Sequence, residues 1–137
     1  MASTKVVFLT GLKEALIEEV VSYSPPDYEV VVLDKSSTEE KRINEVRDDD
    51  FLLFYWQYPS DEVIKSLEKC RLVQLLAAGY DRMNLDLLAE LEIPCANNGG
   101  ANSWAVADQA VLLMLAIYKQ LLASVNSTRD VRCAEHI

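Results

Sequence analysis

Short apolar segments of strand length alternate with helical segments over the first hundred residues of the chain. The segments Lys5–Leu9 and Phe51–Tyr55 are almost wholly apolar, and a strand without polar alternation is buried on both faces, as in a parallel sheet. Parallel strands need long crossover connections, which the helical segments supply. Five strands are expected, at Lys5–Leu9, Tyr28–Leu33, Phe51–Tyr55, Leu72–Ala77 and Ile93–Ala96.

Capping signals place the helices between these strands. Ser37-Thr38-Glu39-Glu40 has the form of a capping box, and Ser60 and Asn84 are suited to cap the helices that follow them. In the first helix, Ala15, Leu16, Val20 and Val21 are predicted to lie on one side. The helices are expected at Lys13–Ser22, from the capping box to about Arg47, at Asp61–Cys70, at Leu85–Leu91, and from Asn102 or Ser103 to about Leu122.

This order of elements predicts an α/β fold. Strands joined by right-handed helical crossovers form a doubly wound parallel sheet. We expect a flavodoxin-like sheet of about five strands in the order 2-1-3-4-5, flanked by helices. In such a fold ligands bind at the carboxyl ends of the strands. That edge would collect Thr10-Gly11, Trp56–Tyr58, Ala78–Asp81 and Asn97–Gly100.

Composition excludes several classes of partner. The 137 residues suit one main domain, and half of them are hydrophobic, so a sizeable core is expected. The net charge of −9 argues against binding to nucleic acid or to an anionic membrane. The longest apolar stretch, Val111–Tyr118, is too short to span a bilayer, and the N-terminus lacks a signal-peptide pattern. The three cysteines indicate free thiols and a cytoplasmic protein.

No metal site is expected. Cys133 and His136 form a C-x-x-H pair near the C-terminus, but two ligands do not make a metal site. Asp48-Asp49-Asp50 precedes a strand without further oxygen ligands at useful spacing, so we interpret it as a solvated acidic loop.

The last expected helix is unusually apolar. From Trp104 to Tyr118 its only charge is Asp108. A helix that is apolar on all sides is buried on all sides, so something beyond this domain should cover it. After Leu122 the apolar pattern fades. Residues 1–122 are therefore assigned to the main domain and residues 123–137 to a tail or a truncated linker.

Two glycine-containing loops stand out at the predicted ligand-binding edge. In Ala77-Ala78-Gly79-Tyr80-Asp81, a glycine after a strand allows a ligand to approach main-chain N–H groups, which suit a carboxylate. The second loop, Asn97–Ser103, combines side-chain amides with two glycines and a helix N-terminus, which also favours an anion. Each loop alone is equally compatible with an ordinary turn.

The order of these motifs resembles a known family. The chain resembles the substrate-binding (catalytic) domain of D-isomer-specific 2-hydroxyacid dehydrogenases. The shared order is a strand, A-x-G-x-D, a helix, a second strand and then N-x-x-G-x-N-S-x-A-V-A-[DE] on an apolar helix. The resemblance covers nearly the whole chain and is most specific over Leu72–Tyr118.

The resemblance implies an NAD(P)-dependent oxidoreductase that interconverts D-2-hydroxy acids and 2-keto acids. It implies that main-chain N–H groups at Ala78 and Gly79 bind the substrate carboxylate, and that Trp56, Gln57 and Tyr58 line the substrate pocket. It also implies that the start of the apolar helix approaches the cofactor, NAD or NADP, and that the Trp104–Tyr118 helix region supports a homodimer. The implied cofactor contacts are Asn102, Ser103, Val106, Ala107 and Asp108.

The residues that bind the cofactor and carry out hydride transfer are expected to lie in another domain, outside this chain. The family binds NAD through G-x-G-x-x-G after a strand, a pattern that this sequence lacks. Its Arg, Glu and His for hydride transfer come from the nucleotide-binding domain, and the sole histidine here, His136, has no matching context. We therefore assign no catalytic residue and expect the chain to be inactive alone. The alternative hypothesis is a non-catalytic truncated relative that acts as a self-association or protein-docking module.

Overall fold

The computed structural model describes residues 3–130, and the chain divides into two compact units, Met1–Gly99 and Gly100–Ile137. The first contains β1 (Thr4–Thr10), α1 (Glu14–Ser22), β2 (Tyr28–Leu33), α2 (Glu39–Val46), β3 (Phe51–Tyr55), α3 (Asp61–Lys65), β4 (Leu72–Leu75), α4 (Leu85–Glu90) and β5 (Cys95–Ala96). The second contains α5 (Ser103–Tyr118) and α6 (Leu121–Asp130).

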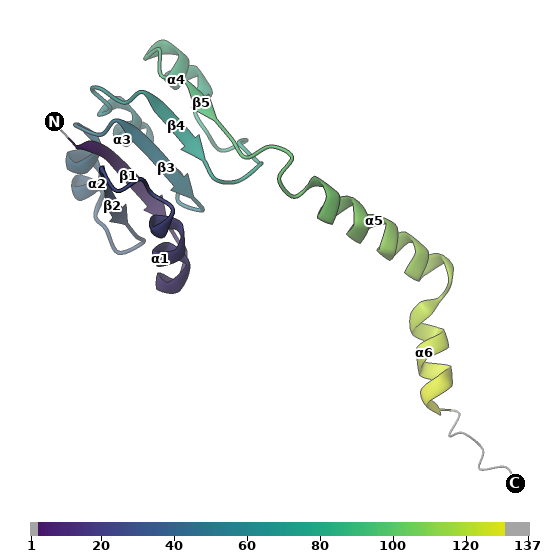
Figure 1. Cartoon of the computed structure of the whole chain (residues 1–137). Helices are drawn as coiled ribbons and strands as arrows, with labels where there is room; N and C mark the ends of the chain where they lie inside the picture. The colour runs from purple at the N-terminus through teal and green to yellow at the C-terminus, as the bar shows by residue number, and fades with distance from the viewer. Residues whose placement is uncertain (1–2, 131–137) are drawn as a thin grey trace, which may run out of the picture. The chain divides into compact units, whose positions relative to one another are not determined.

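The first unit is built on one parallel sheet of five strands in the order β2-β1-β3-β4-β5 (Figure 1). β1 lies between β2 and β3: its Val6 pairs with Val30 of β2 on one side and with Phe51 of β3 on the other. The predicted α/β fold class and strand order are confirmed. The sheet brings the carboxyl ends of β1, β3, β4 and β5 to one edge.

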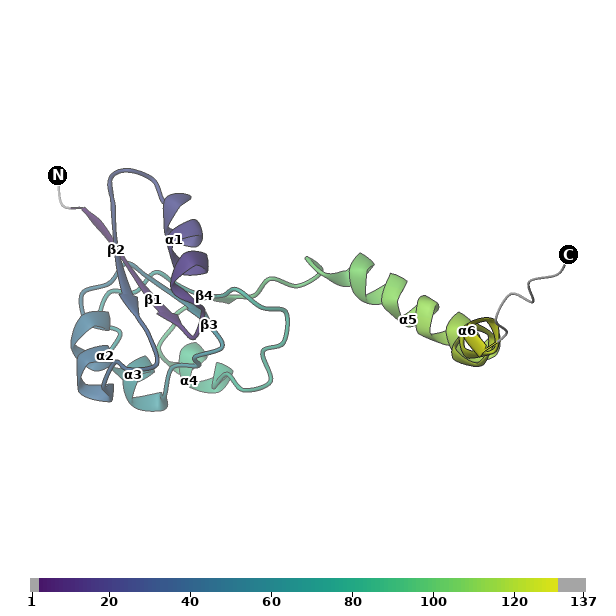
Figure 2. The same cartoon turned by 90° about the horizontal axis from the view of Figure 1, so that it is seen from below.

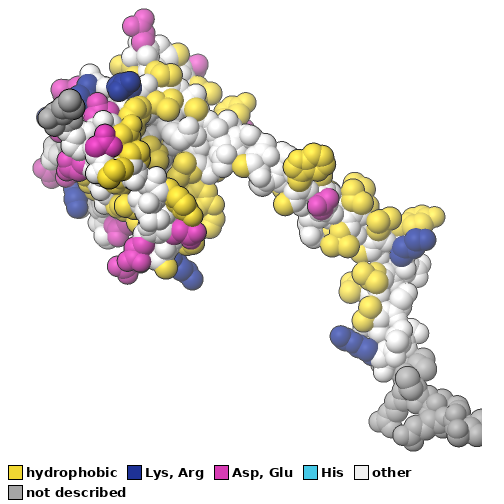
Figure 3. Space-filling model, viewed as in Figure 1, with side chains coloured by type: hydrophobic (Ala, Val, Ile, Leu, Met, Phe, Trp, Pro, Cys, Tyr) yellow, Lys and Arg dark blue, Asp and Glu magenta, His cyan; other side chains and the backbone are white. Residues whose placement is uncertain are grey.

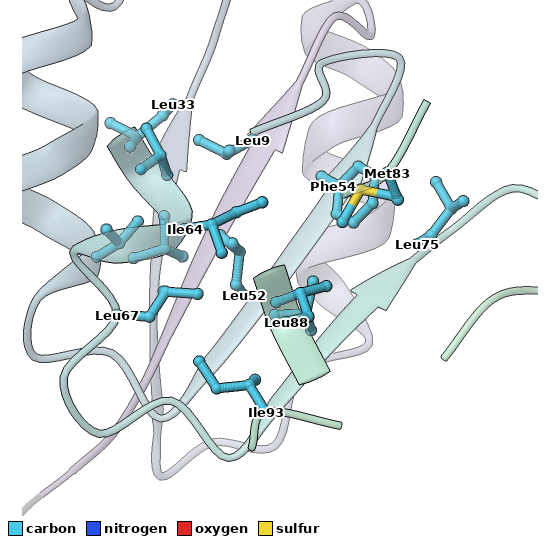
Figure 4. Close-up of a cluster of buried hydrophobic side chains, with 14 residues drawn as sticks. Leu9, Leu33, Leu52, Phe54, Ile64, Leu67, Leu75, Met83, Leu88 and Ile93 are labelled. Carbon is cyan, nitrogen blue, oxygen red and sulfur yellow. The ribbon is translucent and has the colours of Figure 1, made fainter. Parts of the chain in front are cut away.

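Helices cover the two faces of the sheet unequally. α2, α3 and α4 lie together on one face, whereas α1 lies on the other (Figure 2). The main core lies between the sheet and the three helices, where Leu52, Phe54 and Ile64 are removed from solvent (Figure 4). Its members are Val7, Leu9, Leu33, Val46, Leu52, Phe54, Val63, Ile64, Leu67, Val73, Leu75, Met83, Leu88 and Ile93.

The predicted apolar side of α1 is only partly covered. Val20 and Val21 are half-buried, but Ala15 and Leu16 are exposed, and no α1 residue is fully buried. Because no second helix of this unit lies next to α1 on that face, its flank has no neighbour to pack against (Figure 2).

Several elements are shorter than predicted, among them β4, which ends at Leu75 rather than Ala77. α3 ends at Lys65 rather than Cys70, because the chain turns at Ser66 and buries Leu67 in the core. β5 begins at Cys95 rather than Ile93, since Pro94 has no N–H for the ladder and contributes only its carbonyl, which accepts from the N–H of Val73.

The acidic loop is not fully solvated, which corrects the interpretation of Asp48–Asp50. Asp48 is exposed, but Asp49 is fully buried. Asp50 is tied to the strand starts: its N–H donates to the Lys5 carbonyl at 2.8 Å, and its Oδ2 accepts from the Lys5 N–H at 2.9 Å. The N–H of Asp49 also closes back onto the carbonyl of Val46, at 3.5 Å, and this turn places Asp49 inside the unit.

The second unit is a bent pair of helices. α5 ends at Tyr118 rather than near Leu122, because Gln120 adopts a φ of 50° and breaks the helix. The segment after Leu122, predicted to be a polar tail, is helical as far as Asp130, and the two helices meet at 60°. The predicted limit of the main domain at residue 122 stays a prediction.

Within this unit α5 is apolar and uncovered (Figure 3). Every α5 residue except Ala116 is exposed. Across residues 3–130, only the bent pair of α5 with residues 121–129 has the combined length and apolarity of a membrane span, and neither helix has them by itself.

Candidate functional site

Hydrogen bonds join the strand ends at the carboxyl edge of the first unit. The N–H of Gly11, after β1, donates to the carbonyl of Tyr55, at the end of β3, at 3.2 Å. The hydroxyl of Tyr58, after β3, donates to the carbonyl of Gly79, after β4, at 2.9 Å. The amide Nδ2 of Asn97, after β5, donates to the carbonyl of Ala78 at 2.6 Å. The predicted loops are therefore held together.

Three successive carbonyl groups of the loop after β4 accept hydrogen bonds from other elements. The Ala77 carbonyl accepts from the N–H of Asn98 at 3.0 Å. The carbonyls of Ala78 and Gly79 accept from Asn97 and Tyr58, as described above. All three of these carbonyl groups thus accept hydrogen bonds from within the protein.

The N–H groups of the same loop have no hydrogen-bond acceptor among the described residues. Among residues 3–130, no protein group accepts from the N–H groups of Ala78, Gly79 or Tyr80. Gly79 is exposed, and a Cβ built on it would meet only the Asp81 carboxylate, at an ordinary 3.7 Å. Its φ lies outside the left-handed region, so what the glycine contributes is open space rather than a special conformation. Neighbouring free N–H groups beside open space suit an anionic oxygen.

Charged side chains flank these donors. The guanidinium carbon of Arg82 lies 4.8 Å from the ring centroid of Tyr58, whose ring also contacts Phe54 edge-on at 5.3 Å. No carboxylate in the described part of the chain pairs with Arg82. Arg82 therefore offers a positive charge beside the loop, while Asp81 offers a negative one.

Trp56 is exposed to solvent, whereas the side chain of Gln57 is hydrogen-bonded to another segment of the first unit. Trp56 is 66% exposed, stacks on Tyr55 at 5.1 Å and has a φ of 61°, a backbone conformation that is strained for a residue with a Cβ. Such strain often occurs at functional sites. With its amide oxygen oriented toward the donors, Gln57 accepts from Arg42 and from the N–H of Lys35, so its side chain binds the β2–α2 connection.

A pocket of about 200 Å³ lies next to the loop and is lined by Tyr80, Leu85, Cys95, Ala96 and Asn97. Burial raises the pKa of the Cys95 thiol. Sequence reasoning did not assign Tyr80 or Asn97 to the site. Both stood inside the two glycine-containing motifs, which was the available signal for them.

The predicted cofactor contacts lie in the second unit. Asn102 precedes α5 without a side-chain capping bond, and Ser103, Val106 and Asp108 lie in its first two turns. All four residues, and Ala107, are exposed. One exposed helical turn can contact part of a cofactor that is held elsewhere, but it does not enclose a dinucleotide.

Metal binding receives no support from the described residues: across 3–130, no three His, Cys, Asp or Glu side chains gather as ligands. Cys133 and His136, the C-x-x-H pair, lie outside the described residues.

Comparison with solved structures supports the same architecture. A 2-hydroxyacid dehydrogenase from Ketogulonicigenium vulgare aligns with a TM-score of 0.77 and 21% identity, over 100% of this chain and 43% of its own. The NAD⁺-bound 3-phosphoglycerate dehydrogenase of Entamoeba histolytica aligns with a TM-score of 0.64 and 26% identity, over 84% of this chain and 39% of its own. This chain thus spans about two fifths of the length of these structures.

Comparison at the sequence level identifies the family. No match was found among curated proteins. The family model described as "D-isomer specific 2-hydroxyacid dehydrogenase, catalytic domain" matches residues 6–134, which is most of the chain. The chain belongs to the D-isomer specific 2-hydroxyacid dehydrogenase family, and the part that matches is the catalytic domain.

Proposed function

We propose that this chain is the substrate-binding domain of a cytoplasmic, NAD(P)-dependent oxidoreductase that interconverts D-2-hydroxy acids and 2-keto acids, and that it is inactive alone. The observation that carries the proposal is the loop after β4, whose carbonyls are all bonded while its N–H groups are free. Both family substrates, the hydroxy acid and the keto acid, carry a carboxylate. That carboxylate is the group that such donors bind.

The residues of this chain would bind and orient the acid. The N–H groups of Ala78 and Gly79 would hold the carboxylate oxygens. Trp56 and Tyr58 follow the neighbouring strand β3, so they would contact the rest of the substrate. Gln57 would act indirectly, by fixing the β2–α2 connection next to Trp56. Holding the carboxylate and the rest of the substrate at the same time fixes which face of its second carbon meets the reacting groups.

The cofactor would supply the hydride, and we propose that it is held mainly by a nucleotide-binding domain outside this chain. Asn102, Ser103, Val106 and Asp108 would then contact it from the start of α5. The shared length supports this proposal, since the chain spans only about two fifths of the solved family members. The choice between NAD and NADP would be made by that other domain.

The test combines binding with turnover. The chain has only four glycines, so isotope-labelled glycine gives a simple amide spectrum in which Gly79 can be followed. We expect pyruvate and D-lactate to shift the Gly79 resonance saturably, and we expect no oxidation of NADH or NADPH by the chain with pyruvate. Reduction of pyruvate by this chain alone would contradict the proposed inactivity. If the Gly79 resonance does not shift with any 2-keto acid tried, the proposed binding site is contradicted.

The apolar surface of α5 favours a second role, self-association. Large exposed apolar patches mark interaction sites, and α5 exposes Trp104, Leu113 and Ile117 among others. We propose a homodimer formed through the Trp104–Tyr118 helix region. This contact would also serve the alternative function, a docking module without catalysis.

Sedimentation tests the homodimer. We expect the wild-type chain to sediment as a dimer and Ile117→Glu as a monomer, because a charge in an apolar interface is costly. Ala15→Glu, on the exposed side of α1, is the matched control and should remain dimeric. A wild-type chain that sediments as a monomer at all concentrations would exclude this interface.

A further inference from the structure

We infer that Asn97 and Tyr58 are positioning residues, which aim the N–H groups of the loop after β4 at the substrate carboxylate. The inference rests on the proposed function, in which this loop holds the acid. It adds a role for two side chains that contact the loop from opposite sides, Asn97 acting on the Gly79 N–H and Tyr58 on the Tyr80 N–H. The Tyr80 N–H is thereby added as a third donor to those of Ala78 and Gly79.

The two side chains come from the strands that flank β4. Tyr58 follows β3 and Asn97 follows β5, and β4 lies between these strands in the sheet. Tyr58 donates to the Gly79 carbonyl at 2.9 Å, and Asn97 donates to the Ala78 carbonyl at 2.6 Å. The loop is therefore braced on both sides by side chains, in addition to the backbone bond from Asn98 to Ala77.

Because the peptide unit is planar, each of these hydrogen bonds to a carbonyl also fixes the direction of an N–H group. The carbonyl of one residue and the N–H of the next lie in one rigid plane and point in opposite directions when the bond is trans. The described residues contain no cis peptide bond. A bond to the Ala78 carbonyl therefore fixes the direction of the Gly79 N–H, and a bond to the Gly79 carbonyl fixes that of the Tyr80 N–H.

The same bonds strengthen the donors. A carbonyl that accepts a hydrogen bond polarises its peptide unit, so the N–H on the other side becomes a better donor. The hydrogen bond from Asn97 thus strengthens the Gly79 N–H as a donor, and the hydrogen bond from Tyr58 strengthens the Tyr80 N–H. A purely structural brace would lower stability when removed, but it would not single out one amide of the loop.

The experiment follows the glycine amides of the 137-residue chain while pyruvate is added. The N–H of Gly11 is bonded to Tyr55, so its resonance reports that the fold is intact. In Asn97→Ala, we expect the Gly79 amide to bind pyruvate about fivefold to tenfold more weakly, as for the loss of one hydrogen bond. Gly11 should keep its wild-type position.

Two further variants separate the roles. Asn98→Ala removes the neighbouring side-chain amide, which makes no hydrogen bond with residues 3–130, and keeps the backbone bond to Ala77; it should titrate like the wild type. In Tyr58→Phe, with tyrosine also labelled, the Tyr80 amide should lose more of its response than the Gly79 amide.

The possible results separate this inference from the proposed function. If Asn97→Ala binds pyruvate as well as the wild type does, the inference is wrong and the proposed binding site stands. If the wild-type Gly79 amide responds to no 2-keto acid tried, the proposed site is wrong. The order of the Gly79 amide, measured by nitrogen relaxation without ligand, then decides the positioning role: a more mobile Gly79 amide in Asn97→Ala than in Asn98→Ala supports it, and equal mobility overturns it.

Discussion

The carboxyl group of Asp49 lies beside the thiol of Cys70 at the amino-terminal edge of the sheet, opposite the candidate site. Asp49 is fully buried, and neither of its carboxyl oxygens has a hydrogen-bond partner within the described part of the chain. Burial raises the pKa of Asp49 to about 7, while the adjacent Cys70 thiol and the charge of Lys5 oppose this effect and the charges of Asp48 and Asp50 add to it. Burial, with Asp49 nearby, raises the pKa of Cys70 to about 12.

This burial predicts that the chain is less stable at alkaline than at acidic pH. The folded state binds a proton at Asp49 with a pKa of about 7, whereas the unfolded state has the ordinary value of 3.8. The Asp49 contribution is therefore fully present below about pH 4 and is lost as the pH rises to about 7. The difference between 3.8 and about 7 corresponds to roughly 4 kcal/mol.

Asp49→Asn should remove most of this dependence. We expect the variant to be more stable than the wild type at pH 8 by about 1–3 kcal/mol, because it buries no charge. Urea unfolding at pH 5 and pH 8 measures the change. Asp48→Asn is the control, since the hydrogen bond from Lys5 lowers the pKa of this exposed carboxyl, so its effect has the opposite sign. Equal slopes with pH for Asp49→Asn and wild type would contradict the prediction.

The unequal coverage of the sheet predicts different costs for substitutions on its two faces. Ile64→Ala, on the face with three helices, should lower the free energy of unfolding by about 2–5 kcal/mol, because Ile64 is fully buried. Leu16→Ala, on α1, should cost under about 1 kcal/mol, since Leu16 is 47% exposed. Chemical unfolding of both variants tests this, and similar costs would show that α1 is covered in solution.

The charges beside the loop predict opposite effects on anion binding. Arg82→Gln should weaken pyruvate binding by about twofold to fivefold, and Asp81→Asn should strengthen it by a similar factor, as exposed charges contribute modestly. Both effects should shrink at high salt, because the side chains are exposed. Titration of the Gly79 resonance at two salt concentrations measures them. Changes in the same direction for both variants would mean that charge does not govern the site.

The backbone strain at Trp56 predicts an unusual order of stabilities. Glycine adopts a φ of 61° without steric cost, whereas alanine does not. Trp56→Gly and Trp56→Ala both lose the stack on Tyr55, so their comparison isolates the strain. We expect Trp56→Gly to be more stable than Trp56→Ala by about 1 kcal/mol in urea unfolding. The reverse order would show that the turn relaxes in solution.

Much of the fold was predictable because it depends on apolar runs and caps. The five strands and their order follow from segments such as Phe51–Tyr55, and Ser60 and Asn84 cap the helices as expected. Two errors arose where tertiary packing overrides a local pattern. α3 gives way to a turn so that Leu67 reaches the core, and Asp49 is buried although its neighbours are acidic.

The candidate site was predictable only in part. The loop containing Ala78 and Gly79 was recognisable from glycine at a strand end. The roles of Asn97 and Tyr58 were not, because each depends on which carbonyl a side chain from another strand reaches. The helix break at Gln120 was likewise hidden, since nothing in that residue type requires a φ of 50°.

A site made of main-chain N–H groups has a consequence for how such a protein evolves. Every amino acid except proline carries the same donor, so replacing the side chains of this loop leaves the donors in place. The sequence around the loop can therefore diverge widely while the capacity to hold a carboxylate is inherited. This chain shares only 21% of its residues with the structure from Ketogulonicigenium vulgare, and the two have the same fold.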